Sequence, residues 1–195
     1  MNFDQWRKDY DTMTYEEQVA YHNEIESQFP EQKHYNYLWA KRAMQLRPIN
    51  KVLEFGIWKA DLAAAAMADF YKGEWYGIEI CQAAINKTNC PQVQYIFPTR
   101  FDWWNEARPV DPDIIIATHF IEHLSNDHFR QLVTYCAGVP VIHFEAPLTD
   151  KGNTWDGYFG THKLEYGWND INQLFEAEGY TLAINNTEAK TYLLQ

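Results

Sequence analysis

Short apolar segments alternate along this chain with segments whose apolar residues recur at helical spacing. Strands are predicted at 51–55, 74–80, 93–97, 114–117, 139–144, 180–185 and 191–194. Helices are predicted at 15–27, 34–45, 61–71, 82–88, 126–138 and 168–178. The run from Ile114 to Ala117 is continuously apolar, which is typical of a central parallel strand covered on both faces. The alternation favours a parallel α/β sheet, and the short polar connection between the last two strands favours an antiparallel hairpin.

The length of 195 residues is sufficient for one domain with a sizeable core. We expect an N-terminal helical extension at 1–47 and one α/β domain at 48–195. Thr14 and Glu17 form a capping-box pattern, so the first helix should begin near Tyr15, and it should end before Pro30. The pattern leaves open whether this extension is an inert brace or a cover over the substrate side of the domain.

Composition excludes several classes of function. The net charge is −11 and no long Lys/Arg cluster occurs, which argues against a long nucleic acid and against an anionic membrane surface. The three cysteines are scattered without CxxC spacing, which argues against a disulfide framework or a zinc ribbon. No run approaches the roughly 18 apolar residues of a membrane span, and the N-terminus lacks an apolar signal region. A cytoplasmic protein is therefore expected; its oligomeric state stays open.

The first strand leads into a turn at Gly56, and a helix is predicted from Asp61. A strand, a glycine turn and a helix N-terminus form a cradle for a nucleotide-like ligand. Glu79 ends the second strand, and its two carboxylate oxygens could accept both hydroxyl hydrogens of a ribose; the alternative is a solvated strand end. A dinucleotide dehydrogenase would need G-x-G-x-x-G here, and Trp58 would crowd a diphosphate.

This turn resembles the opening motif of class I S-adenosylmethionine (SAM)-dependent methyltransferases, in which an acidic residue (Glu54) and a glycine (Gly56) follow a hydrophobic strand. The family's further glycines are replaced by Trp58 and Ala60. The resemblance implies a Rossmann-like α/β fold, with a seven-stranded, mostly parallel sheet, an antiparallel last strand and helices on both faces. It implies SAM as cofactor, held by Glu54, Gly56, Ile57, Trp58, Glu79, Ile80, Asp102, Trp103 and Thr118. Asp102 would bond the adenine amino group and Trp103 would stack on the ring, unless this segment is an ordinary polar loop.

The richest cluster of reactive side chains follows the central strand. His119, Glu122 and His123 have i, i+3, i+4 spacing, which places all three on one face of a helical turn. Imidazole and carboxylate groups at such a place are metal ligands or acid–base groups. His143, near the end of the fifth strand, is a further candidate base or a satisfied polar group of the core.

Glu122 and His123 match the last two positions of the Glu-x-x-Glu-His motif of small-RNA 2′-O-methyltransferases, and quinone-biosynthesis O-methyltransferases carry a similar motif. His162 resembles the later histidine of the small-RNA enzymes, and His119 replaces their first glutamate. The resemblance implies a divalent metal held by His119, Glu122, His123 and His162. Three imidazoles and one carboxylate suit Zn, Mn, Fe or Co better than Mg, which prefers oxygen ligands. The alternative is a Glu-His pair that caps a helix without metal.

Together these features predict a SAM-dependent methyltransferase that acts on a small molecule, by O-methylation of a sugar or aromatic hydroxyl. The expected catalytic residues are His119, Glu122, His123 and His143. Three alternatives remain: a SAM- or nucleotide-binding protein without catalysis, an RNA-terminal 2′-O-methyltransferase, and a metal-dependent hydrolase or NAD enzyme on a similar sheet. The acceptor itself cannot be read from the sequence.

Overall fold

The computed structural model describes residues 13–28, 37–98, 108–153 and 163–195. Among these residues, seven strands form one sheet in the order β3-β2-β1-β4-β5-β9-β8. They are β1 (Lys51–Phe55), β2 (Glu74–Ile78), β3 (Gln94–Ile96), β4 (Ile114–Thr118), β5 (Val141–Glu145), β8 (Tyr180–Asn185) and β9 (Ala189–Leu194). The strands β6 (Leu148–Thr149) and β7 (Gly152–Asn153) form a separate two-stranded ladder.

The sheet is mostly parallel, as the alternating pattern predicts. β1 pairs in parallel with β2 on one side and with β4 on the other, so the direction of strand order reverses between β1 and β4. β9 is antiparallel to both of its neighbours, β5 and β8. The expected Rossmann-like sheet with an antiparallel last strand is thus confirmed, and its strand-order reversal marks the edge where open α/β sheets bind ligands.

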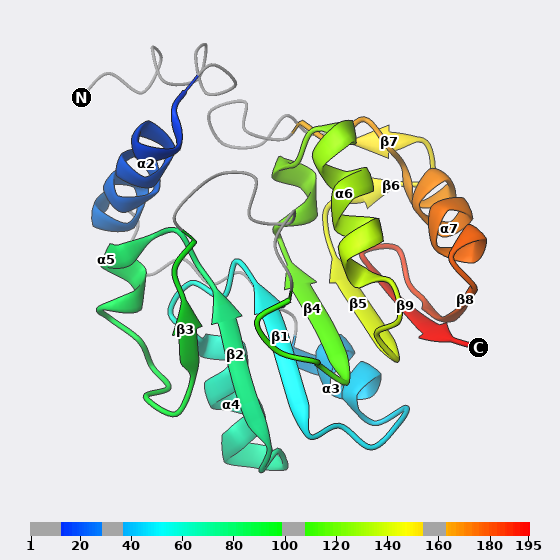
Figure 1. Ribbon diagram of the computed structural model, residues 1–195, viewed down its shortest axis with the longest axis horizontal. Coiled ribbons are helices and arrows are strands. Elements are labelled where there is room, and N and C mark those ends of the chain that lie inside the picture. Colours follow the sequence, from blue (N-terminus) through cyan, green and yellow to red (C-terminus); the bar gives the residue numbers. More distant parts are fainter. Residues whose placement is uncertain (1–12, 29–36, 99–107, 154–162) are drawn as a thin grey trace.

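Helices cover both faces of the sheet (Figure 1). Figure 1 shows α6 and α7 in front of the sheet and α3 and α4 behind it, while α2 lies beyond the carboxyl ends of the strands, beside α5. Their bounds are α2 (Tyr15–Gln28), α3 (Tyr37–Met44), α4 (Asp61–Asp69), α5 (Gln82–Ile85), α6 (Asn126–Cys136) and α7 (Trp168–Ala177). Within the described ranges, no helix is both long and apolar enough to cross a membrane.

Two apolar cores follow from this layering. All five residues of β4 are buried, because that strand lies in the middle of the sheet with helices on both sides. Ile115 packs into the core shared with α6 and α7, whereas Ile114 and Ile116 pack into the core shared with α3 and α4. Successive side chains of this strand point to opposite faces of the sheet and so contribute to both cores.

Several predicted boundaries differ from the structure. β2 ends at Ile78, so Glu79 lies in the turn after the strand, and α5 is a single turn rather than a helix through Thr88. The segment after His119 is not an α-helical turn: only Ile121–His123 are helical, and they form a 3₁₀ turn, η3. The predicted long loop at 148–166 contains the β6–β7 ladder. Periodicity misses such features because they are too short to repeat their pattern.

Gly77 of β2 allows the turn after β1 to pack directly on its neighbour strand. A β-carbon on Gly77 would lie 2.5 Å from both Cδ1 and Cγ2 of Ile57, closer than atoms can approach. Ile57 is itself buried, with 3% of its surface exposed. The bare glycine backbone thus sets the position of the turn that begins at Gly56.

We predict that Gly77→Ala destabilises the protein by about 1–3 kcal/mol, because the added methyl group overpacks the site. Ile57→Ala should also destabilise, by opening a cavity. The double variant should be less destabilised than the sum of the two, since each change makes room for the other. Urea unfolding of all four proteins measures this coupling; strictly additive losses would contradict the close approach.

Candidate active site

The turn between β1 and α4 has an unusual backbone. Gly56, Trp58 and Ala60 all have positive φ angles, of 65°, 53° and 62°. Two of these residues carry a β-carbon, which makes the left-handed conformation costly. Such strain persists only where the surrounding structure holds it in place, and it gathers at functional sites. The turn therefore needs outside support.

Glu79 supplies part of that support. Its Oε2 accepts a hydrogen bond from the backbone N–H of Trp58 at 2.7 Å, and its Oε1 accepts one from Cys81 N–H at 2.8 Å. Burial raises the pKa of Glu79 to about 6, against the lowering effect of the bonds from Cys81 and Trp58. The backbone N–H of Ile80 is a third donor to this carboxylate, which still leaves lone-pair capacity for a ligand hydroxyl while Glu79 holds the two turns together.

Glu54 has a different environment from the one expected of a cofactor contact. It is buried in β1, and its Oε2 accepts a hydrogen bond of 2.9 Å from the indole N–H of Trp75. Burial raises the pKa of Glu54 to about 8, although the bond from Trp75 lowers it. The side chain is therefore protonated at neutral pH and joins β1 to β2 within the core.

At the end of β4, His119 and Glu122 form a pair, with 3.3 Å between Nδ1 and Oε1. His119 has a positive φ of 50° and a side chain that is 43% exposed, while Glu122 is 1% exposed. The hydrogen bond to Glu122 raises the pKa of His119 against the effect of burial. Burial alone would raise the pKa of Glu122, but His119 and His123 hold it below its usual value. The pair is thus an exposed imidazole held by a buried carboxylate.

The carboxylate of Glu122 has few partners. Apart from His119 and the backbone N–H of Glu122 itself, neither of its buried oxygens has a hydrogen-bond partner within the described residues. Its backbone carbonyl accepts bonds from Lys163 N–H at 2.7 Å and Leu164 N–H at 3.1 Å, which joins the segment at 163–164 to η3. An underused buried carboxylate beside a histidine is suited to orienting a base or a cationic ligand.

The metal expected from the sequence is not shown. No group of three or more histidine, cysteine, aspartate or glutamate side chains arranged to hold a metal occurs among the residues that the structure describes. His162 lies outside those residues, as do Asp102 and Trp103, so their expected roles stay predictions. His119 and Glu122 contact one another, and this pair by itself is not a metal site.

The remaining expected residues lie as follows. His143 is fully buried, with Nδ1 2.9 Å from Thr191 Oγ1 and Nε2 3.0 Å from Glu145 Oε1. Of its two sequence-based interpretations, this environment favours the satisfied core group over the base. Thr118 is buried at the end of β4, and Ile80 is half-buried directly after Glu79.

Helix α2 brings residues to this edge that the sequence did not single out. Asn23 and Glu26 bind the turns on either side of Glu79, and His22 lies close enough to His123 to interact with it electrostatically. Burial, and next the charge of His123, lower the pKa of His22 to about 3. The His22 side chain is half-buried. No apolar stripe of this helix marks these polar residues, because their partners are distant in the sequence.

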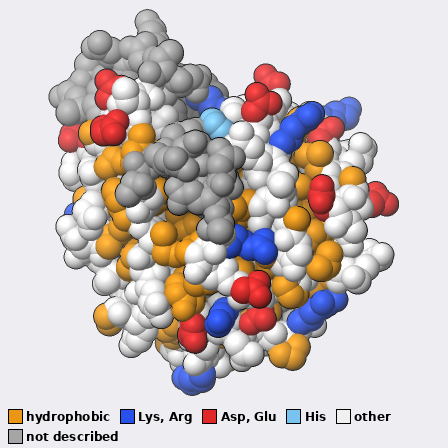
Figure 2. Space-filling model, viewed as in Figure 1, with side chains coloured by type: hydrophobic (Ala, Val, Ile, Leu, Met, Phe, Trp, Pro, Cys, Tyr) orange, Lys and Arg blue, Asp and Glu red, His pale blue; other side chains and the backbone are white. Residues whose placement is uncertain are grey.

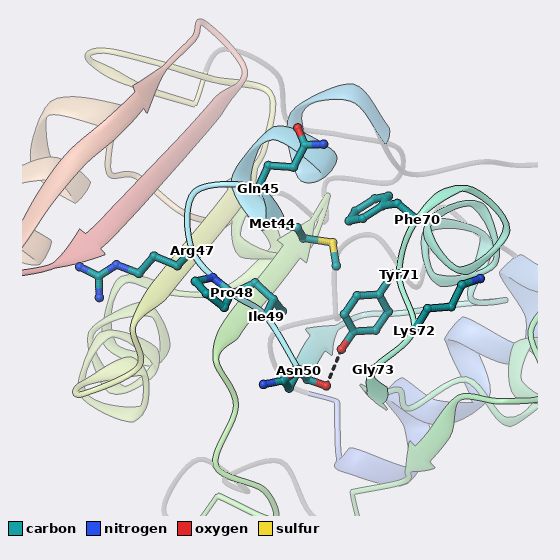
Figure 3. Close-up of a pocket in the computed structure, with 10 residues that line it drawn as sticks. All are labelled: Met44, Gln45, Arg47, Pro48, Ile49, Asn50, Phe70, Tyr71, Lys72 and Gly73. Carbon is teal, nitrogen blue, oxygen red and sulfur yellow. Dashed lines mark hydrogen bonds between the residues drawn. The ribbon is translucent and has the colours of Figure 1, made fainter.

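A pocket of about 370 Å³ lies at the opposite end of the sheet (Figure 3). It is formed by the segments that precede β1 and β2, and within it Tyr71 O–H donates a hydrogen bond of 2.7 Å to the carbonyl of Asn50. Figure 3 shows Arg47 and Lys72 on either side of the pocket, with both side chains pointing away from it. Since open α/β sheets bind ligands at the carboxyl ends of their strands, this amino-end pocket is not the candidate site.

The cationic side chains on the visible surface are scattered (Figure 2). On the face drawn in Figure 2, lysine and arginine side chains lie scattered among aspartate and glutamate rather than gathered in a stripe. Hydrophobic side chains gather over the β2 and β3 side of this face. A scattered distribution of this kind gives no continuous track for a phosphate backbone on the visible, described surface.

Comparison with known proteins identifies the class of fold. No protein-family model matches the sequence, and no curated protein matches it. Solved structures do match: a putative methyltransferase in complex with the Haloferax volcanii Trm112 activator has a TM-score of 0.61 at 12% identity, covering 96% of this chain and 80% of that one. The methyltransferase domain of bacterial CtHen1 has a TM-score of 0.62 at 10% identity, covering 81% and 97%. Human N-acetylserotonin methyltransferase in complex with SAM has a TM-score of 0.61 at 13% identity, and the match covers 93% of this chain and 56% of that one.

The chain therefore has the fold of the class I SAM-dependent methyltransferases. Another structure with this fold, at a TM-score of 0.63 and 11% identity, is a pericyclic reaction enzyme. The fold alone thus defines a class of architecture, and the reaction has to be argued from the site.

We predict that Glu54→Gln removes a pH dependence of stability. Glu54 has a raised pKa in the folded protein, so the folded state keeps a proton that the unfolded chain releases from about pH 4.5 upward. The resulting loss of unfolding free energy between pH 5 and pH 8 is on the order of 3–5 kcal/mol. The glutamine variant should lack this loss, whereas Glu176→Gln on the exposed side of α7 should retain it. Parallel pH slopes in urea unfolding of the wild type and Glu54→Gln would contradict the protonated state.

A second prediction concerns the His119–Glu122 pair. Glu122→Gln should lower the pKa of His119, because the hydrogen bond and charge that raise it are weakened. NMR titration of the imidazole measures this, with Glu165→Gln, a change at an exposed residue just before α7, as the control. An unchanged His119 titration in Glu122→Gln would show that the pair does not form in solution.

Proposed function

We propose that this protein is a SAM-dependent methyltransferase that transfers a methyl group to a hydroxyl of a small molecule. One observation carries the proposal: the strained turn and Glu79 lie at the strand-order reversal, where His119 and Glu122 follow the adjacent β4. A ribose-binding carboxylate and an acid–base pair at one edge suit a donor and an acceptor bound side by side. Support for SAM comes from structures of this fold solved with SAM or with SAH.

In the proposed cofactor site, Glu79 accepts the ribose hydroxyls with the lone-pair capacity left by the backbone donors Trp58, Cys81 and Ile80. Its raised pKa, about 6, leaves it ionised at neutral pH, as an acceptor of two hydroxyl hydrogens must be. Gly56 supplies close backbone approach at the turn. Ile57, Trp58, Ile80 and Thr118 complete the proposed lining, and Asp102 and Trp103 are proposed for the adenine ring.

SAM, when bound, supplies an electrophilic methyl group on a sulfonium. The protein's part is to orient the acceptor and remove its proton. His119 Nδ1 is held by Glu122, so Nε2 is the atom proposed to take the proton from the acceptor hydroxyl. The carboxylate then stabilises the imidazolium, as an orienting acid does in other base–carboxylate pairs. With SAM bound, the acceptor oxygen would take the methyl group from the sulfonium sulfur, and His119 would hold the proton that the hydroxyl gives up.

The proposed metal, with His123 and His162 as further ligands, is left to experiment. The buried, underused oxygens of Glu122 suit a cation, but the described residues alone do not assemble three ligands. No step of the mechanism is assigned to it. If chelation abolishes turnover and Zn, Mn, Fe or Mg restores it, His119 and Glu122 are ligands rather than a base and its orienter.

A second candidate is an RNA-terminal 2′-O-methyltransferase. The likeness of Glu122 and His123 to the small-RNA enzymes favours it, as does the structural match to the bacterial CtHen1 domain. The net charge of −11 and the scattered surface cations favour the small-molecule acceptor.

We predict that the wild type binds SAM and SAH in titration calorimetry, with and without EDTA. Glu79→Ala should weaken SAM binding at least about tenfold, since it removes a buried charged acceptor worth more than about 1.4 kcal/mol. His119→Ala should leave SAM affinity within about twofold and remove methyl transfer to a panel of sugars, phenols and short RNAs. Turnover should rise with pH through the raised pKa of His119, because the base must be neutral. Equal loss of SAM binding in Glu79→Ala and His119→Ala would contradict this division of roles. Binding of NAD that SAM does not displace would favour the dehydrogenase alternative.

A further inference from the structure

Helix α2 is tied to each of the three turns that follow β1, β2 and β3. Glu26 forms ion pairs of 3.1 Å with Lys59 after β1 and with Lys87 after α5. Asn23 Oδ1 accepts a hydrogen bond of 2.9 Å from Ala83 N–H at the start of α5. Tyr15 O–H donates to the carbonyl of Pro98 after β3. These anchors span the carboxyl edge of half of the sheet.

Two contacts of α2 involve residues at or next to the donors that bind Glu79. Lys59 follows Trp58, whose N–H binds Glu79 Oε2, and it lies between Trp58 and Ala60, which are both left-handed. On the other side, Cys81 donates its N–H to Glu79 Oε1 and its thiol to the carbonyl of His22, 3.4 Å away. Helix α2 thus contacts both of the turns whose backbone N–H groups bind the Glu79 carboxylate.

The Glu26–Lys59 pair is placed where an ion pair is effective as a positional constraint. Glu26 is fully buried and the Lys59 side chain is 9% exposed, whereas Lys87 is 52% exposed. A buried pair adds little net stability. Breaking it is nevertheless costly, so the pair holds its two side chains in a fixed relative position. The strained backbone at 58–60 needs such a constraint to persist.

We propose that Glu26 is a positioning residue for the cofactor site, acting through Lys59 on the turn that carries Trp58. The N-terminal helix is then a working part of that site rather than an inert brace. The inference rests on the proposed function, because the affected ligand is SAM. It adds a residue from outside the α/β domain to the set that determines cofactor affinity.

The test compares Glu26→Gln with Glu16→Gln, which makes the same charge change at an exposed position of the same helix. Glu26→Gln should weaken SAM and SAH binding about tenfold or more in calorimetry, while Glu16→Gln stays within about twofold. Hydrogen–deuterium exchange at residues 57–60 should become faster in Glu26→Gln alone. In Glu26→Gln combined with Lys59→Gln, SAM affinity should be no worse than in Glu26→Gln, since both act through one contact.

The outcomes separate the two proposals. A wild type that binds SAM, with a folded Glu26→Gln variant that binds it equally well, would overturn the positioning role and leave the proposed function intact. A lowered melting temperature with unchanged SAM affinity and unchanged exchange at 57–60 would reduce Glu26 to a brace and also overturn it. A wild type that binds neither SAM nor SAH would overturn the proposed function together with this inference. If Glu26→Gln does not fold, the double variant, which leaves no unpaired buried charge on either partner, gives the same comparison.

Discussion

The hydrogen bonds that Glu79 accepts from Trp58 and Cys81 are the constraint on which the candidate site depends. They link the turn after β1 to the turn after β2, and so fix two loops that would otherwise be independent. The β1 turn has a conformation that its side chains resist, so it needs partners on more than one side. Gly77 beneath the turn, Glu79 beside it and α2 above it supply those partners.

Burial assigns different protonation states to the carboxyl groups at this edge. Among the described residues, Glu54 has one hydrogen-bond donor, Trp75, and becomes neutral, whereas Glu79 has three backbone donors and remains an anion at neutral pH. Glu122 stays ionised despite its burial because two histidines stand near it. Three glutamates near one edge thus have three roles, set by the number and charge of their partners rather than by their position in the sequence.

Periodicity and turn residues were enough to predict the sheet, because strands such as β4 and helices such as α6 repeat their pattern over several residues. They were also enough to place Glu79 and His119 at the carboxyl edge, since that follows from topology. They were not enough to separate Glu54 from Glu79, since both are acidic residues near strand ends and only tertiary burial distinguishes them. Nor could they find Glu26, because a polar residue on a helix face looks solvated until its partner Lys59, distant in the sequence, is known.

The order of strands along the chain has a consequence for how the protein is made. Strand β8 pairs only with β9 within the sheet, and β9 also pairs with β5, so a later-synthesised strand must insert between two earlier ones. During translation β8 has no neighbouring strand to pair with until β9 has left the ribosome. Until then β5 is an exposed edge strand with unpaired backbone amides. Nascent chains at this stage are candidates for chaperone capture, because closure of the sheet requires contacts between distant segments.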